Sequence, residues 1–149
     1  MRRALLPVLL FALATPAPAA DLRFDLPLVD FLHVRTKERR GYVSSIVELG
    51  SRPASYCWLQ LAVSTPERPR VIHLHRDVLG ARDPIVLSVD TRAVNPLPWP
   101  GGASWSGCRP ITRATAWAIV RTPHRFYLDV HTPAFPRGEL RARHRGPAR

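Results

Sequence analysis

Two histidines alternate with aliphatic residues in the stretch Val-Ile-His-Leu-His, residues 71 to 75. On a β-strand, side chains two residues apart point to the same face. We therefore expect His73 and His75 to share one face, about 6–7 Å apart along the strand. This spacing allows two imidazoles to converge on one metal ion.

The run from Phe126 to His131 follows the same alternation. Its inward positions are expected to be Phe126, Leu128 and Val130, and its outward positions Tyr127, Asp129 and His131. If this strand lies near the first, three imidazoles and one carboxylate share a surface. Three nitrogen ligands suit Cu(II) or Zn(II), with Asp129 or water completing the shell. A thioether site for Cu(I) is excluded, because the only methionine, Met1, belongs to the expected leader.

Structural roles for these side chains are open alternatives. An outer sheet face has to carry polar residues, and a single H-x-H is a weak motif. His131 and Thr132 could cap a hairpin through side-chain hydrogen bonds, and Glu139 could form a cross-strand ion pair with Arg141. The other histidines lie in segments that look like loops or termini, so we expect them at the surface: His33, His124 and His144.

Catalysis has little support in the sequence. It contains no Gly-x-Ser-x-Gly elbow, phosphate-binding loop or zinc-protease motif. Asp129 and Glu139 are conceivable as paired acids, but nothing places them around a substrate cleft. The stretch Gly138-Glu139-Leu140-Arg141 is better explained as a turn and a strand, with Gly138 allowing the tight bend. We do not expect an enzyme.

The elements that must position these side chains are short strands between prolines, of which the chain has 16. The predicted strands are Leu22–Leu28, Gly41–Leu49, Ser55–Ser64, Val71–His75, Ile85–Val89, Phe126–His131 and Glu139–Arg143. Pro110–Arg121 is predicted to hold a short helix, and the stretch from Asn95 to Gly102 a long irregular loop. Strands at this spacing favour an antiparallel sandwich or barrel.

The strand Ser55–Ser64 carries one of two cysteines. Its odd-numbered positions are expected to form a core face and to carry the cysteine inward: Cys57, Leu59, Leu61 and Val63. Cys57 and Cys108 allow a single disulfide, which an even cysteine count favours in an exported chain. Closing a loop of this length is worth about 4 kcal/mol in the chain-entropy model.

Residues 1–20 have the features of a secretory signal peptide. Arg2 and Arg3 precede a short apolar run, and Ala17-Pro18-Ala19-Ala20 supplies the small residues that a signal peptidase accepts. We place the cleavage after Ala19 or Ala20. The rest is expected to be one domain over residues 21–143 and a disordered tail over 144–149, without a membrane span. The predicted location is periplasmic or secreted.

The net charge of +11 at pH 7 raises the question of an anionic partner. Lys37 is the only lysine among 22 basic residues, and the arginines are scattered without a helical stripe. Because the basic patch typical of nucleic-acid binders is missing, we do not expect nucleic-acid binding. An unidentified protein or envelope component is the expected partner.

The segment FYLDVHTPAFPRGELR, residues 126–141, resembles the closing motif of the CHRD domain, the module first named in chordin, which reads roughly Y-V-N-V-H-T-x-x-x-P-x-G-E-I-R-G. His73-Leu74-His75 is similar to the family's H-I-H element, and Gly80 and Pro84–Leu87 match the loop and strand that follow it. Ser106-Gly107-Cys108 and the helix after it also match many bacterial members. The similarity runs from about Tyr56 to Arg143.

Some family features differ here. The early G-A-x-E-V-P element is absent, Arg76-Asp77 follows the second histidine, and Ala142 replaces a glycine. The resemblance implies an all-β, immunoglobulin-like antiparallel β-sandwich with one short helix before the last hairpin, in an exported bacterial protein. We expect a non-enzymatic binding or structural module. The alternative is a periplasmic protein that binds Cu(II) or Zn(II) through the H-x-H pair and His131, with redox activity as an option.

Overall fold

The computed structural model describes residues 22–30, 40–78, 83–93, 95–99 and 102–145. They form the elements β1 (Leu22–Asp30), β2 (Arg40–Glu48), β3 (Ser55–Ser64), β4 (Val71–Arg76), β5 (Ile85–Asp90), β6 (Leu97–Trp99), β7 (Gly102–Pro110), α1 (Arg113–Arg121), the 3-10 turn η1 (Pro123–Arg125), β8 (Phe126–His131) and β9 (Leu140–Arg143). The expected signal peptide over residues 1–20, His33 and Gly80 lie outside the described residues.

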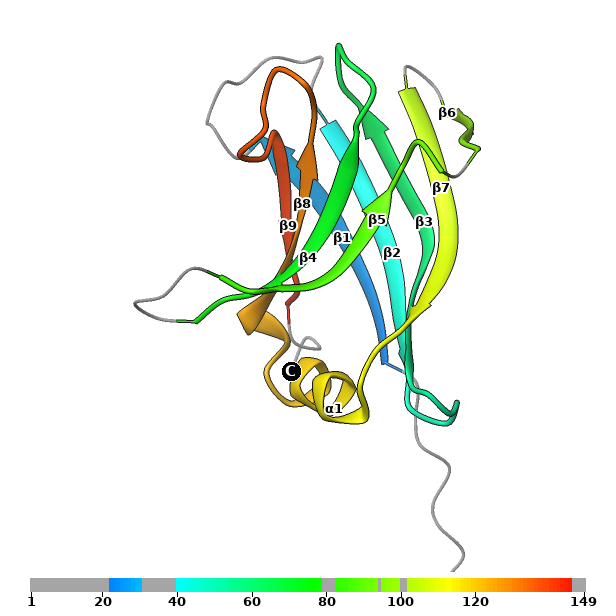
Figure 1. Ribbon diagram of the computed structural model, residues 1–149, viewed down its shortest axis with the longest axis vertical. Helices are drawn as coiled ribbons and strands as arrows, with labels where there is room; N and C mark the ends of the chain where they lie inside the picture. The colour runs from blue at the N-terminus through cyan, green and yellow to red at the C-terminus, as the bar shows by residue number, and fades with distance from the viewer. Residues whose placement is uncertain (1–21, 31–39, 79–82, 94, 100–101, 146–149) are drawn as a thin grey trace, which may run out of the picture.

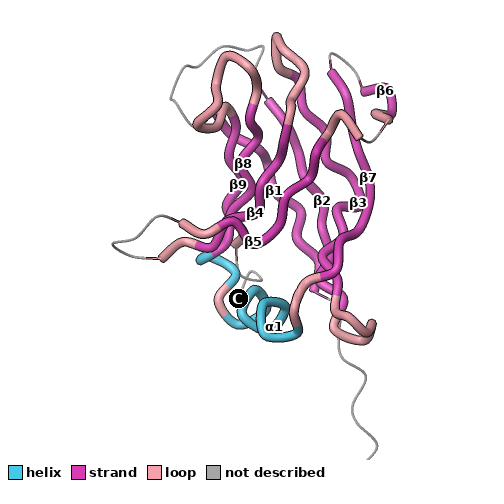
Figure 2. Tube along the Cα trace, viewed as in Figure 1, coloured by secondary structure: helices cyan, strands magenta, loops and turns pink. Residues whose placement is uncertain are grey.

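The strands pack as two antiparallel layers, which confirms the expected β-sandwich (Figure 1). The hydrogen-bonding order is β5-β4-β8-β9-β1-β2-β3-β7-β6. The first four strands make one layer, and β1, β2, β3 and β7 make the other. Strand β1 links them, because Val29 and Asp30 pair with β9 while the preceding residues pair with β2. Helix α1 lies at one end of the sandwich (Figure 2).

The space between the layers holds the apolar core. On β4, Ile72 and Leu74 are buried and face inward, while His73 and His75 alternate with them and are half-buried. Leu128 on β8 belongs to the same core. The alternation expected from the sequence therefore places the two histidines on the outer face of their layer.

Strand β3 departs from the simple alternation. The core face carries Tyr56 and Trp58 before the middle of the strand, and Leu61 and Val63 after it. Between them the pairing with β7 shifts register, so that β3 has one residue more than its neighbour. This β-bulge reverses the phase of the strand and leaves Leu59 47% exposed. The expectation that Leu59 is a core residue is therefore wrong, whereas Leu61 and Val63 are core residues as predicted.

The same phase reversal changes the position of the cysteine. Cys57 lies between the inward-facing Tyr56 and Trp58, so it is on the opposite face of the strand from them; it is buried, as expected, but it does not share the core face of Leu61 and Val63. It pairs with Cys108 across β3 and β7, with Cα atoms 4.0 Å apart. The predicted Cys57–Cys108 disulfide is present and joins two adjacent strands of one layer.

The stretch from Asn95 to Gly102 is not a purely irregular loop. Leu97–Trp99 forms the short edge strand β6, which pairs with the beginning of β7. An edge strand tolerates Pro98, because a missing backbone N–H on its outer side breaks no hydrogen bond of the ladder. The prediction of a structureless loop is wrong for these residues.

Helix α1 begins at Arg113, later than Pro110, because β7 continues through Pro110. Thr112 is the N-cap residue, and its side-chain oxygen accepts a hydrogen bond from the backbone N–H of Thr115 at 3.0 Å. Such a cap satisfies one of the free donors at the start of a helix.

His144 corrects a further prediction. It is fully buried and not a surface residue. Its Nδ1 donates to the carbonyl of Phe126 at 3.3 Å, and its Nε2 lies 2.9 Å from the hydroxyl of Tyr56. His144 therefore packs against the sandwich, and residues 146–149 of the expected tail lie outside the described residues. His124 is exposed, as expected.

Candidate metal centre

Strands β4 and β8 are direct neighbours, and their register sets the candidate site. Val71 lies opposite His131, His73 opposite Asp129, and His75 opposite Tyr127. Because outward positions of paired strands share one face, His73 and His75 lie beside His131 and Asp129 as predicted.

The three imidazoles form a compact cluster. One ring nitrogen from each of His73, His75 and His131 lies within 4.8 Å of the other two. The ring of His73 lies between the others, with its centroid 4.6 Å from that of His131 and 5.5 Å from that of His75. Zn–N bonds of about 2.0–2.1 Å in a tetrahedral shell separate the ligand nitrogens by about 3.3 Å. Small side-chain rotations would therefore bring the three nitrogens to a shared ion.

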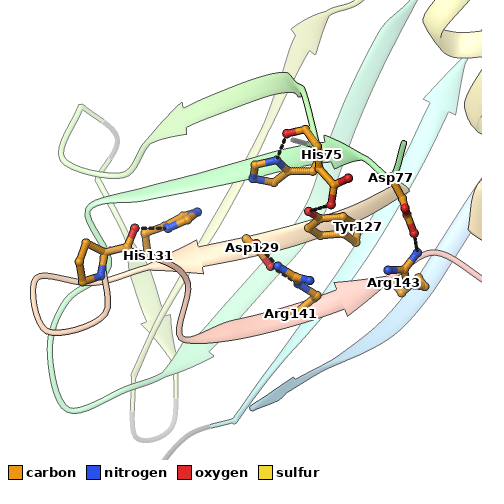
Figure 3. Close-up of polar contacts among 9 residues, drawn as sticks. His75, Asp77, Tyr127, Asp129, His131, Arg141 and Arg143 are labelled. Carbon is orange, nitrogen blue, oxygen red and sulfur yellow. Dashed lines mark hydrogen bonds and ion pairs between the residues drawn. The ribbon is translucent and has the colours of Figure 1, made fainter. Parts of the chain in front are cut away.

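Backbone carbonyls fix the orientation of two of these rings. His75 Nδ1 lies 3.1 Å from the carbonyl oxygen of Asp83, and His131 Nδ1 lies 3.0 Å from that of Pro136 (Figure 3). A carbonyl oxygen only accepts, so each Nδ1 carries a proton, and Nε2 is the nitrogen that bears the lone pair in the neutral ring. This arrangement is typical of metal-binding histidines, whose second nitrogen donates to a carbonyl or carboxylate.

The lone pairs are available for a ligand. The Nε2 atoms of His75 and His131 are buried and have no hydrogen-bond partner among the described residues. Burial, together with the neighbouring imidazoles of His131 and His75, lowers the pKa of His73 to about 4. His73 is therefore neutral at neutral pH, which is the state that binds a metal.

Asp129 lies on the same face but outside the three-imidazole cluster. Its Oδ1 accepts from Arg141 Nε at 2.6 Å and its Oδ2 accepts from Arg141 Nη2 at 2.6 Å (Figure 3). The side chain of Asp129 is 4% exposed. Arg141 thus forms an ion pair with Asp129, and among the described residues no ion pair joins it to Glu139, which was the alternative.

The turn between β8 and β9 uses the residues expected to cap it. The backbone N–H of Phe135 donates to the side chain of Thr132 at 3.3 Å. Gly138 adopts a positive φ of 111°, which an L side chain rarely adopts. Glu139 is buried in the turn. The capping alternative and the three-imidazole cluster are therefore compatible. His131 Nδ1 bonds to the carbonyl of Pro136 in the turn, and His131 Nε2 remains available for a ligand.

Two residues beside the site did not follow from the sequence pattern. The ring of Tyr127 stacks on that of His75, and its hydroxyl donates to the carboxylate of Asp83. Asp83 also accepts from the backbone N–H of Val78 at 3.1 Å. Tyr127 was expected to face outward, but nothing in its spacing pointed to a partner in the β4–β5 connection. The Asp-Pro step at residues 83 and 84 is the only local signal for a fixed backbone there.

No helix among the described residues is long and apolar enough to cross a membrane. A search of curated proteins and a search of solved structures each found no match. The family model of the CHRD domain matches residues 40–143, a range that runs from β2 to β9 and includes all three histidines of the cluster. The match begins upstream of Tyr56, where the resemblance in the sequence starts. This chain therefore belongs to the CHRD domain family.

Proposed function

We propose that this protein is an exported CHRD domain that binds a divalent transition-metal ion, Cu(II) or Zn(II), through His73, His75 and His131. The single observation that carries the proposal is the convergence of three imidazole nitrogens within 4.8 Å of one another. Imidazole is a preferred ligand of both ions. The protein acts as a binding module and not as an enzyme.

The environment of the rings supports metal binding over a purely structural role. A hydrogen bond to Nδ1 alone would explain the orientation of His75 and His131, but it leaves both buried Nε2 atoms without a partner. Leaving such a buried polar atom unsatisfied costs about 1–3 kcal/mol. A metal ion bound to the Nε2 atoms removes this cost.

Export is supported by two independent features. The leader-like sequence over residues 1–20 has the charge and apolar pattern of a signal peptide. The Cys57–Cys108 disulfide suits an oxidising compartment. An exported protein would bind metal ions that are present in the periplasm or outside the cell.

Calorimetric titration of the purified protein with Cu(II) and with Zn(II) tests the proposal. We expect one ion per chain, with Cu(II) bound more tightly than Zn(II), as is general for nitrogen ligands. The double substitution His73→Ala, His75→Ala should abolish binding. His124→Ala is the matched control, because His124 is exposed and lies in η1 outside the cluster. Unchanged affinity in the double variant, or no heat with either ion in the wild type, would refute the proposal.

A further inference from the structure

The carboxylate of Asp129 lies beside the proposed metal centre and is bound by another side chain. Asp129 is the cross-strand partner of His73, on the outer face of the layer. A carboxylate oxygen is one of the ligands that a divalent ion such as Zn(II) accepts. Arg141 instead binds both oxygens of Asp129, each at 2.6 Å. Such a bidentate, charge-assisted pair is among the strongest side-chain hydrogen-bonding arrangements in proteins.

Arg141 is itself held in place from two sides. In the pairing of β8 with β9 it lies directly opposite Asp129. Its guanidinium carbon lies 4.0 Å from the centroid of the Tyr127 ring, in the range of a cation–π contact. Tyr127 stacks in turn on His75. The guanidinium stays cationic in proteins and presents its donors in a fixed fork, which matches the two oxygens of Asp129.

We infer that Arg141 is a positioning residue that keeps Asp129 out of the coordination shell of the bound ion. The ion is then held by three imidazoles, and its fourth coordination position is open to water, which a small anion can replace. The inference rests on the proposed function. Three neutral imidazoles leave the full charge of +2 on the bound ion, and this charge favours an anionic exogenous ligand such as hydroxide, azide or a halide. A carboxylate from Asp129 would occupy that position and lower the charge.

The test uses the full chain loaded with one equivalent of Cu(II), with electron paramagnetic resonance and an azide titration followed by absorption. For the wild type we expect hyperfine coupling to three nitrogens and a new azide-to-copper charge-transfer band. Arg141→Met releases Asp129, so the copper parameters should shift towards mixed nitrogen and oxygen coordination and the azide band should be lost. Adding Asp129→Asn to Arg141→Met should restore the band.

Arg143→Met is the matched control. Arg143 lies two residues away on β9 and also lies over the Tyr127 ring, but it pairs with Asp77. Its loss should leave the spectrum and the azide band unchanged. If Arg141→Met does not fold, as judged by circular dichroism, Arg141→Lys replaces it, because a lysine cannot bind both oxygens of Asp129 in the same way.

The outcomes separate the two proposals. If the wild type binds no Cu(II), the proposed function fails and this inference fails with it. A second outcome is that the wild type binds Cu(II) without an azide band and that Asp129→Asn alone changes the copper spectrum. Asp129 is then already a ligand, so the inference is wrong while the proposed function stands. An azide band that persists unchanged in Arg141→Met would also overturn the role of Arg141.

Discussion

The phenol ring of Tyr127 stacks on the imidazole of His75, with centroids 5.1 Å apart and planes inclined by 13°. Its hydroxyl donates to Asp83, whose backbone carbonyl accepts from His75 Nδ1. Burial and this hydrogen bond raise the pKa of Tyr127, and the same hydrogen bond lowers the pKa of Asp83. At neutral pH the phenol is therefore protonated and the carboxylate ionised, and their hydrogen bond holds Asp83 beside His75.

Asp83→Ala is expected to weaken Cu(II) and Zn(II) binding. Without its carboxylate, residue 83 loses its hydrogen bonds to Tyr127 and to the backbone of Val78, and its carbonyl, which orients His75, is held less firmly. Loss of such an outer-shell partner typically costs about 10–100-fold in metal affinity. Calorimetric titration measures the change. Asp90→Ala is the control, since Asp90 is on β5 and, within the described part of the chain, its carboxylate contacts only the exposed Arg92. Equal affinities for Asp83→Ala and the wild type would contradict this role.

The histidine cluster is predictable from the sequence because it depends only on strand periodicity and on the pairing of β4 with β8. Alternation puts His73 and His75 on one face, and the closing motif puts His131 on another strand whose outer face is polar. The pairing of Asp129 with Arg141 is not predictable in this way. It depends on the register of β8 with β9, which the turn between them sets, and a shift of one residue would direct Arg141 to the other face.

The β3 bulge shows a second limit. The sequence around Leu59 has no glycine or proline that marks an irregularity, and its alternating pattern continues through the strand. Only the pairing with β2 and β7 reveals the extra residue. A phase error of this kind reverses the inside and outside of every position on one side of the bulge, which is why Cys57 was expected inward.

The bulge predicts opposite outcomes for two leucines of the same strand. Leu61→Ala removes a side chain that is 2% exposed in the core and is expected to lower the free energy of unfolding by about 2–5 kcal/mol. Leu59→Ala, at a position 47% exposed, is expected to change it by about 0.5 kcal/mol or less. Urea unfolding followed by tryptophan fluorescence measures both. Equal destabilisation by the two substitutions would argue against the bulge.

The disulfide is expected to contribute strongly to stability. Replacing both Cys57 and Cys108 by serine should lower the free energy of unfolding by about 4 kcal/mol, because the open loop regains its entropy in the unfolded chain. Urea unfolding of the double variant measures the loss. Wild-type protein treated with a reductant is the control and should unfold at the same urea concentration as the double variant. A midpoint equal to that of the oxidised wild type would show that the cross-link contributes little.

A buried histidine should make the fold sensitive to acid. His144 lies between the carbonyl of Phe126 and the hydroxyl of Tyr56, which in turn lies 3.0 Å from Ser45 Oγ. Burial lowers the pKa of His144 to about 4 and raises the pKa of Tyr56, so both groups are neutral in the folded protein at neutral pH.

The unfolded chain takes up a proton at His144 near its ordinary pKa of 6.5, whereas the folded protein does so only near 4. Between these values the unfolded state binds more protons, so the contribution to stability is complete above about pH 6.5 and is lost as the pH falls to about 4. A difference of this size corresponds to about 3 kcal/mol. His73, whose pKa is also lowered, contributes in the same window.

The test therefore compares the urea-unfolding free energy of wild type and His144→Gln from pH 7 to pH 4. We expect a shallower slope in the variant and the wild-type slope in the exposed control His124→Gln. Parallel slopes for wild type and His144→Gln would mean that the buried imidazole does not cause the acid sensitivity.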